Sequence, residues 1–155
     1  MRLISICINR QYLYYSLFDK DSENILLIEN DRIAIPQNQS HTELMGSIYT
    51  LTKDLLRDKN LNKAIIVTPS SNATITSAMM ITHIMTSGIT TLSCLDDKIS
   101  VDYKSTANIS PKKLGYPGKT KNSVILEAVD NIFPNMTYKN NDMRKTVLLG
   151  YEELL

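Results

Sequence analysis

The first 35 residues carry apolar side chains in the pattern of β-strands. Two apolar runs, residues 3–8 and 12–18, are separated by three polar residues. A third run, residues 25–35, follows a charged stretch, and the polar pair Asn30-Asp31 is expected to interrupt it. Because short connections place consecutive strands side by side and antiparallel, this pattern predicts a three-stranded antiparallel meander.

The pattern changes to helical spacing after residue 39. Ser40 and Glu43 have the spacing of a capping box, which marks the start of a helix. Apolar residues then recur every three or four positions over about four turns, at Leu44, Ile48, Leu51 and Leu55. The continuous apolar run 64–67 follows and is typical of a central strand buried on both faces, which we expect to lie parallel to the first strand.

Residues 72–95 are rich in threonine, but the spacing of their apolar residues predicts one long helix. The residues at intervals of three or four are Ala78, Ile81, Met85, Gly88, Leu92 and Leu95. We call this set the helix seam. Its small members would allow another helix to approach closely, and the alternative is ordinary packing on the sheet of the same domain.

The remaining third of the chain predicts a strand and three helical segments. Residues 98–104 alternate as a strand, Pro111 begins a short helical turn, residues 123–133 form an amphipathic helix, and Asn141 caps a last helix. The predicted order is βββαβαβααα. This order indicates a single α/β domain over residues 1–155, with helices on both faces of the sheet.

Composition excludes several classes of protein. The 155 residues include 17 Lys+Arg and 16 Asp+Glu, so the chain as a whole does not attract nucleic acid or membranes. Cys7 and Cys94 lie in apolar stretches, which predicts buried reduced thiols. No apolar run approaches about 20 residues, so we expect a cytoplasmic protein without membrane contact. The abundance of Ile, Asn and Lys suits an AT-rich viral or phage genome.

The distribution of charge is uneven. Residues 98–121 contain six lysines and one acid, whereas residues 19–31 contain five acids and one lysine. Lysines at this density provide salt-sensitive contacts to phosphates that do not depend on base sequence. The predicted nucleic-acid-binding residues are Lys104, Lys112, Lys113, Lys119 and Lys121. A solvated surface without a ligand is the alternative.

One stretch resembles a known family. It runs from Ser77-Ala78 through the long helix to Val101-Asp102-Tyr103, and then through residues 110–115 and 119–121 into the next helix. In this stretch and in its element order the chain resembles the RuvC-type Holliday-junction resolvases of the ribonuclease H-like superfamily. The resemblance implies a ribonuclease H-like mixed sheet, with an antiparallel meander and parallel strands. It also implies a homodimer, for which the expected interface residues are Ala78, Ile81, Met85, Gly88 and Leu92.

The resemblance implies a nuclease site, but this sequence lacks most of its acids. Such sites hold two divalent metal ions among carboxylates on the first strand, the strand after the first helix, and the last helix. The corresponding positions here are Cys7, Asn9, Thr68, Asp142 and Lys145, and residues 1–18 contain no Asp or Glu. We therefore expect a degenerate metal site, with no catalytic residue, no metal ion and no cofactor. Asp142 has a simpler interpretation, as a charge that stabilises a helix N-terminus.

The sequence supports three functional hypotheses. The first is a RuvC-like pseudoenzyme that binds DNA or RNA, branched or duplex, without cutting it. The second is a protein-interaction module that binds a protein partner through the acidic 19–31 hairpin or the long helix. The third is an active metal-dependent junction endonuclease with an atypical site built from Asp142, Asp102 and Asn9.

Overall fold

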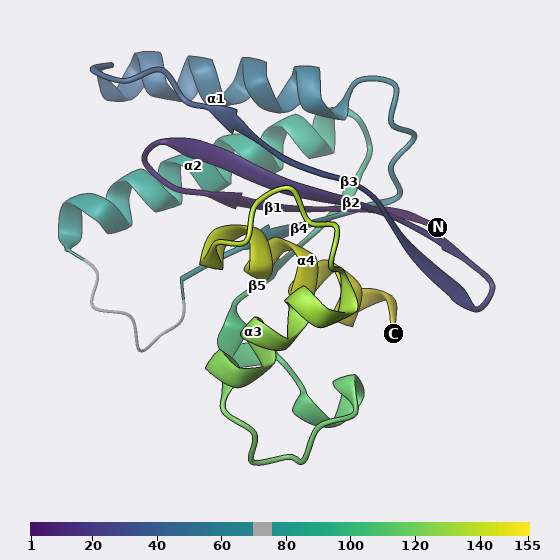
Figure 1. Cartoon of the computed structure of the whole chain (residues 1–155). Helices are drawn as coiled ribbons and strands as arrows, with labels where there is room; N and C mark the ends of the chain where they lie inside the picture. Colours follow the sequence, from purple (N-terminus) through teal and green to yellow (C-terminus); the bar gives the residue numbers. More distant parts are fainter. Residues whose placement is uncertain (70–75) are drawn as a thin grey trace.

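The computed structural model describes residues 1–69 and 76–155. Its centre is a five-stranded sheet in the order β3-β2-β1-β4-β5 (Figure 1). The strands are β1 (Arg2–Ile8), β2 (Tyr12–Asp21), β3 (Asn24–Ala34), β4 (Lys63–Val67) and β5 (Ser100–Lys104). β1, β2 and β3 form the antiparallel meander, and β4 and β5 run parallel to β1. The predicted mixed α/β sheet is therefore confirmed.

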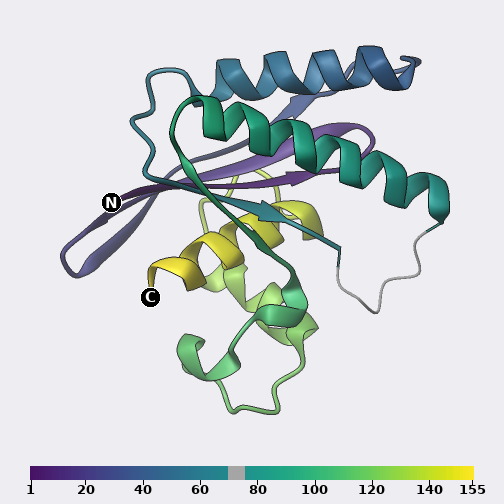
Figure 2. The same ribbon diagram turned by 180° about the vertical axis from the view of Figure 1, so that it is seen from behind.

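Helices cover both faces of the sheet (Figures 1 and 2). On one face lie α1 (His41–Leu56) and α2 (Ser77–Asp96), and on the other lie α3 (Asn122–Ile132) and α4 (Asn141–Leu154). Two short 3-10 helices, η1 (Thr106–Asn108) and η2 (Pro111–Leu114), follow β5. Alternate residues of β1 point into two hydrophobic cores on opposite faces of the sheet. Leu3 is buried on the α4 side and Ile4 is buried on the α1 side.

Local signals in the sequence set several boundaries correctly. The capping box is present at the start of α1, where Ser40 Oγ accepts from the backbone N–H of Glu43 and the Glu43 carboxylate accepts from the backbone N–H of Ser40. The expected interruption at Asn30-Asp31 is wrong, because β3 is continuous and its irregularity is a bulge at Ile28. The N-cap of α4 is Asn140, one residue before the predicted one.

Only part of the predicted helix 72–95 can be compared with the structure. α2 begins at Ser77 and is capped by Thr76, whose side chain accepts from the backbone N–H of Met79. The first residues of the expected helix, 72–75, lie outside the described residues. From Ser77 to Asp96 α2 is one continuous helix, as the spacing of the apolar residues predicted.

α4 lies unusually close to the sheet. A Cβ at Gly150 would overlap the ring of Phe18 and would stand 3.2 Å from the Cβ of Ser5. Only a glycine allows the helix backbone this close approach to β1 and β2. The contact fixes α4 on the sheet, and thereby fixes the side chains at its N-terminal end over the end of β1.

Candidate functional site

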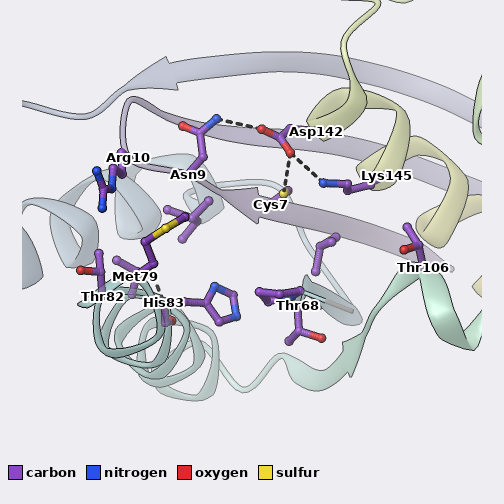
Figure 3. Close-up of a pocket in the computed structure, with 14 residues that line it drawn as sticks. Cys7, Asn9, Arg10, Thr68, Met79, Thr82, His83, Thr106, Asp142 and Lys145 are labelled. Carbon is purple, nitrogen blue, oxygen red and sulfur yellow. Dashed lines mark hydrogen bonds and ion pairs between the residues drawn. The ribbon is translucent and has the colours of Figure 1, made fainter. Parts of the chain in front are cut away.

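A cavity of about 400 Å³ opens beside the C-terminal ends of β1 and β4, between α2 and α4 (Figure 3). Its lining includes all five positions that the sequence predicted for the degenerate metal site: Cys7, Asn9, Thr68, Asp142 and Lys145. These residues are up to 138 positions apart in the sequence, and the fold brings them to one place because parallel strands end at the same edge of the sheet.

The Asp142 carboxylate is satisfied by side chains of the same chain. Its Oδ2 accepts a hydrogen bond from Asn9 Nδ2 at 2.8 Å. Its Oδ1 forms an ion pair with Lys145 Nζ at 3.1 Å and lies 3.9 Å from the Cys7 thiol (Figure 3). Lys145 stands one turn after Asp142 on α4, so both groups of the ion pair belong to the same helix.

Cys7 contributes a neutral thiol. Burial raises the pKa of Cys7 to about 12, and the negative charge of Asp142 adds to the increase. Thiolates, not thiols, act as nucleophiles and soft metal ligands. At neutral pH this residue is therefore neither a strong nucleophile nor a counterpart of a carboxylate.

The donor set does not fit a pair of divalent ions. Mg²⁺ takes hard oxygen ligands, and the described lining offers a single carboxylate that is already paired with a lysine. Over residues 1–69 and 76–155 there is no group of three or more His, Cys, Asp or Glu side chains placed to hold a metal ion. Asp102, the third member of the hypothetical atypical site, does not line the cavity and instead pairs with Lys63 at 2.6 Å.

The cavity also contains residues that sequence reasoning did not select. Arg10 follows β1, and His83 projects from α2 toward the side of the cavity where Thr68 lies (Figure 3). Burial lowers the pKa of His83, so this imidazole is neutral at pH 7. The sequence contains one indication that Arg10 lies at the site, because it directly follows Asn9. It contains no such indication for His83, because only the packing of α2 over the sheet turns this residue toward β4.

The predicted lysine surface is mostly present. Lys112, Lys113, Lys119 and Lys121 are exposed on the segment of η2 and the following turn, which extends away from the sheet (Figures 1 and 2). The Nζ atom of Lys113 donates to the backbone carbonyl of Glu152 at 3.3 Å and forms no ion pair among the described residues. Lys104 differs from these four, because it forms ion pairs of 2.9 Å and 2.6 Å with Glu152 and Glu153. The lysine surface considered below is therefore Lys112, Lys113, Lys119 and Lys121.

The helix seam lies on α2 and faces away from the sheet. Ile81 is 51% exposed and Leu92 is 54% exposed, and Ala78 and Gly88 are exposed beside them, while Met85 is half-buried. The buried face of α2 is mostly polar instead, with Thr86, Ser87, Thr90 and Ser93 buried beside the core residue Cys94. The alternative that the seam packs on the sheet of its own domain is therefore wrong.

The composition of α2 bears on membrane association. By length and composition alone, this helix of 20 residues is long and apolar enough to cross a membrane. Threonine, serine and histidine side chains interrupt the apolar residues of this helix, so it is not the continuous apolar run of about 20 residues that the sequence analysis looked for. Within the domain, Thr86 and Thr90 of this helix are buried, whereas Ile81 and Leu92 are exposed.

Solved structures with the same architecture define the fold. Thermus thermophilus RuvC, in complex with a Holliday junction substrate, matches with a TM-score of 0.75 and 10% identity over 98% of this chain and 91% of that one. The yeast mitochondrial Holliday junction resolvase Ydc2 matches with a TM-score of 0.66 and 10% identity, over 98% and 78% of the two chains. The fowlpox virus Holliday junction resolvase matches with a TM-score of 0.54 and 18% identity over the whole of both.

The chain therefore has the ribonuclease H-like fold of RuvC-type Holliday-junction resolvases. No protein-family model matches the sequence, and neither does any curated protein. At 10–18% identity the likeness defines the fold, and the chemistry of the cavity has to be judged from its own residues.

Proposed function

We propose that this protein is a RuvC-like pseudoenzyme that binds branched or duplex DNA without cutting it by two-metal chemistry. The observation that carries the proposal is the donor set of the cavity. Asp142 is the single carboxylate among the described lining residues, and Lys145 neutralises it at 3.1 Å. Two-metal cleavage needs a cluster of carboxylates to hold the ions that activate water and stabilise the leaving oxygen.

The lysine surface supports the binding part of the proposal. Its four lysines are exposed and lie within ten residues of one another. The acidic 19–31 hairpin belongs to β2 and β3, at the edge of the sheet opposite to β5, the strand that precedes the lysines. Several lysines on one segment contact successive phosphates and release counterions. One of the structural neighbours is itself bound to a Holliday junction substrate.

The test is a salt-dependent binding measurement. We expect the full chain to bind a fluorescein-labelled four-way junction and a duplex at low salt in EDTA, measured by fluorescence anisotropy. The double variant Lys119→Glu/Lys121→Glu is expected to bind at least about tenfold more weakly, with a salt slope lower by roughly two. Reversal of all four lysines is expected to abolish binding.

A matched control separates the lysine surface from net charge. The double variant Arg57→Glu/Lys139→Glu changes net charge by the same amount at two other exposed positions. We expect it to keep most of the affinity. Absence of binding by the parent chain at low salt, or equal losses in the two double variants, would contradict the proposal.

A homodimer through α2 is the second part of the proposal. The seam exposes Ile81 and Leu92 on a helix that carries no charged residue from Ser77 to Leu95. An exposed apolar face of this kind is typical of an interface. We expect sedimentation to give a dimer for the parent chain and a monomer for Ile81→Lys/Leu92→Lys, and a monomeric parent at about 50 μM would contradict it.

The other hypotheses give different outcomes in simple assays. A protein-interaction module would retain its partner in a pull-down after nuclease treatment and would not bind the labelled junction. An atypical nuclease would cut the junction in Mg²⁺ or Mn²⁺ and lose this activity in Asp142→Ala. Cleavage with that dependence would overturn the proposal that this protein is a pseudoenzyme.

A further inference from the structure

β3 forms one edge of the sheet, and part of this edge is open. β3 pairs with β2 on one side and with no other strand among residues 1–69 and 76–155. Thr137 contacts the strand at one point, where its backbone N–H donates to the side chain of Asn30 at 2.7 Å and its hydroxyl donates to the Asn30 carbonyl at 2.9 Å. In the described part of the chain, residues 24–29 have no comparable backbone contact outside β2. The backbone groups that they direct away from β2 are a template for another strand.

The open part of β3 presents two large aliphatic side chains. Ile25 and Leu27 pack against the core on the α4 side, so Leu26 between them points to the other face of the sheet. Leu26 and Ile28 are both more than half exposed. In both views the end of the hairpin formed by β2 and β3 extends beyond the helices (Figures 1 and 2). Free edges usually carry a lysine or proline that prevents pairing, and residues 24–29 contain neither.

The charges beside this segment indicate the kind of partner. Asp21 and Glu23 lie before it and Asp31 lies after it, and these three are exposed and form no ion pair among the described residues. Opposite charges on neighbouring strands stabilise a sheet, whereas like charges destabilise it. A second copy is therefore disfavoured, because antiparallel pairing of two β3 strands centred on Leu27 would place Glu23 of each copy near Asp31 of the other. A basic strand fits instead.

We infer that the open part of β3 binds an extended peptide segment of another protein, which adds a strand to the edge of the sheet. The segment has apolar side chains at alternate positions, which contact Leu26 and Ile28, and lysine or arginine near its ends, beside the exposed acids. Backbone hydrogen bonds to residues 24–29 supply affinity, and the side chains supply specificity. The inference goes beyond the proposed function and does not depend on it, because β3 and β5, the strand that precedes the lysine surface, form opposite edges of the sheet.

The probe is a phage-displayed library of random heptapeptides, selected on the immobilised full chain. We expect the enriched peptides to alternate apolar and polar residues and to carry at least two lysines or arginines. The most enriched peptide, labelled with fluorescein, is expected to bind Leu26→Lys/Ile28→Lys about tenfold more weakly or worse, because each lysine removes an apolar contact and repels the basic peptide. Both side chains are exposed, so their replacement leaves the core intact.

Two further variants separate the apolar contacts from the charged ones. Asp21→Asn/Glu23→Gln is expected to weaken binding about threefold at low salt and to have no effect at about 1 M salt. Ile81→Lys/Leu92→Lys changes two exposed apolar residues of α2 in the same way, and this matched control is expected to keep the affinity of the parent chain.

Hydrogen exchange measured by NMR tests whether the peptide pairs as a strand. We expect the bound peptide to slow exchange at backbone N–H groups within residues 24–29, which contacts between side chains alone would not do. Unchanged exchange in this segment would contradict the inference, even for a peptide that binds tightly.

Other outcomes would also overturn the inference. These are a selection that enriches no peptide, enriched peptides without basic residues, and full affinity for Leu26→Lys/Ile28→Lys. Loss of a parent dimer in that variant, measured by sedimentation, would identify a second copy as the occupant of the edge and exclude the peptide. Binding of the labelled junction does not enter any of these measurements, so failure of the proposed function and failure of this inference are distinguishable.

Discussion

The two ends of α4 use charged residues in opposite ways. At its N-terminal end one carboxylate, Asp142, pairs with Lys145 beside an open cavity. At its C-terminal end two carboxylates pair with lysines from the sheet. Here Glu152 and Glu153 contact Lys104, and Lys63 joins Glu153 to Asp102.

The difference shows that a concentration of acids does not by itself mark a functional site. The C-terminal network is the more acidic of the two, but its Glu152 side chain is only 6% exposed and is already paired. The N-terminal pair is more accessible, at 33% for Lys145 and 26% for Asp142. Charges that are accessible and loosely held are able to exchange partners with a ligand, whereas the buried network holds α4 on the edge of the sheet.

The largest effect is expected from breaking the C-terminal network. Lys104→Met leaves the buried Glu152 carboxylate without its ion-pair partner, and we expect a loss of about 3 kcal/mol in the free energy of unfolding. Urea denaturation measures this loss. Lys63→Met is the control, because its partner Asp102 is 52% exposed and its other partner, Glu153, keeps an ion pair with Lys104, and a loss of no more than about 1 kcal/mol is expected. Equal losses would mean that burial does not distinguish the two lysines.

A smaller effect is expected from the middle of α4. Gly150→Ala places a methyl group against Phe18 and Ser5, where no space exists, and we expect a loss of about 2 kcal/mol from overpacking. Gly46→Ala on α1 is the matched control, because a Cβ there meets nothing within 4 Å. The control is expected to gain up to about 1 kcal/mol from helix propensity. Unchanged stability in Gly150→Ala would show that α4 is free to shift on the sheet.

The smallest effect on stability is expected at the N-terminal end. Asp142→Asn removes an accessible ion pair and a favourable helix-end charge, together worth less than about 1 kcal/mol. The same urea titration provides the measurement. A loss as large as that of Lys104→Met would place Asp142 in the structural class with Glu152, and the contrast between the two ends would then be wrong.

Much of the fold could be predicted because its signals are local. The polar connections of the meander and the capping box at Ser40 each act over a few residues, and both are present in the structure. The orientation of α2 could not be predicted in this way. Both of its faces lack charge, so the spacing of Ile81 and Leu92 identifies a seam but not the side on which it lies. Packing of its threonines against the domain decides that side.

The site was predictable only in part, because its contacts are distant in sequence. The resemblance to the resolvases selected Cys7 and Asp142, which the structure places 3.9 Å apart across 135 positions. The prediction that Lys104 contacts nucleic acid could not take account of Glu152, which comes 48 residues later and forms an ion pair with the lysine. His83 was not selected, because its place in the cavity depends on how α2 crosses the sheet.

The spacing between Cys7 and Asp142 has a consequence for protein engineering. Conversion of this cavity into a metal-binding site cannot proceed by single favourable steps. A carboxylate at position 7 would face Asp142 within about 4 Å, and like charges at that distance raise the pKa of one of them until it stays protonated. Removal of Lys145 first would take away the only cation paired with Asp142 among the described residues. Each change becomes favourable only after the others have been made, so the positions would have to change together.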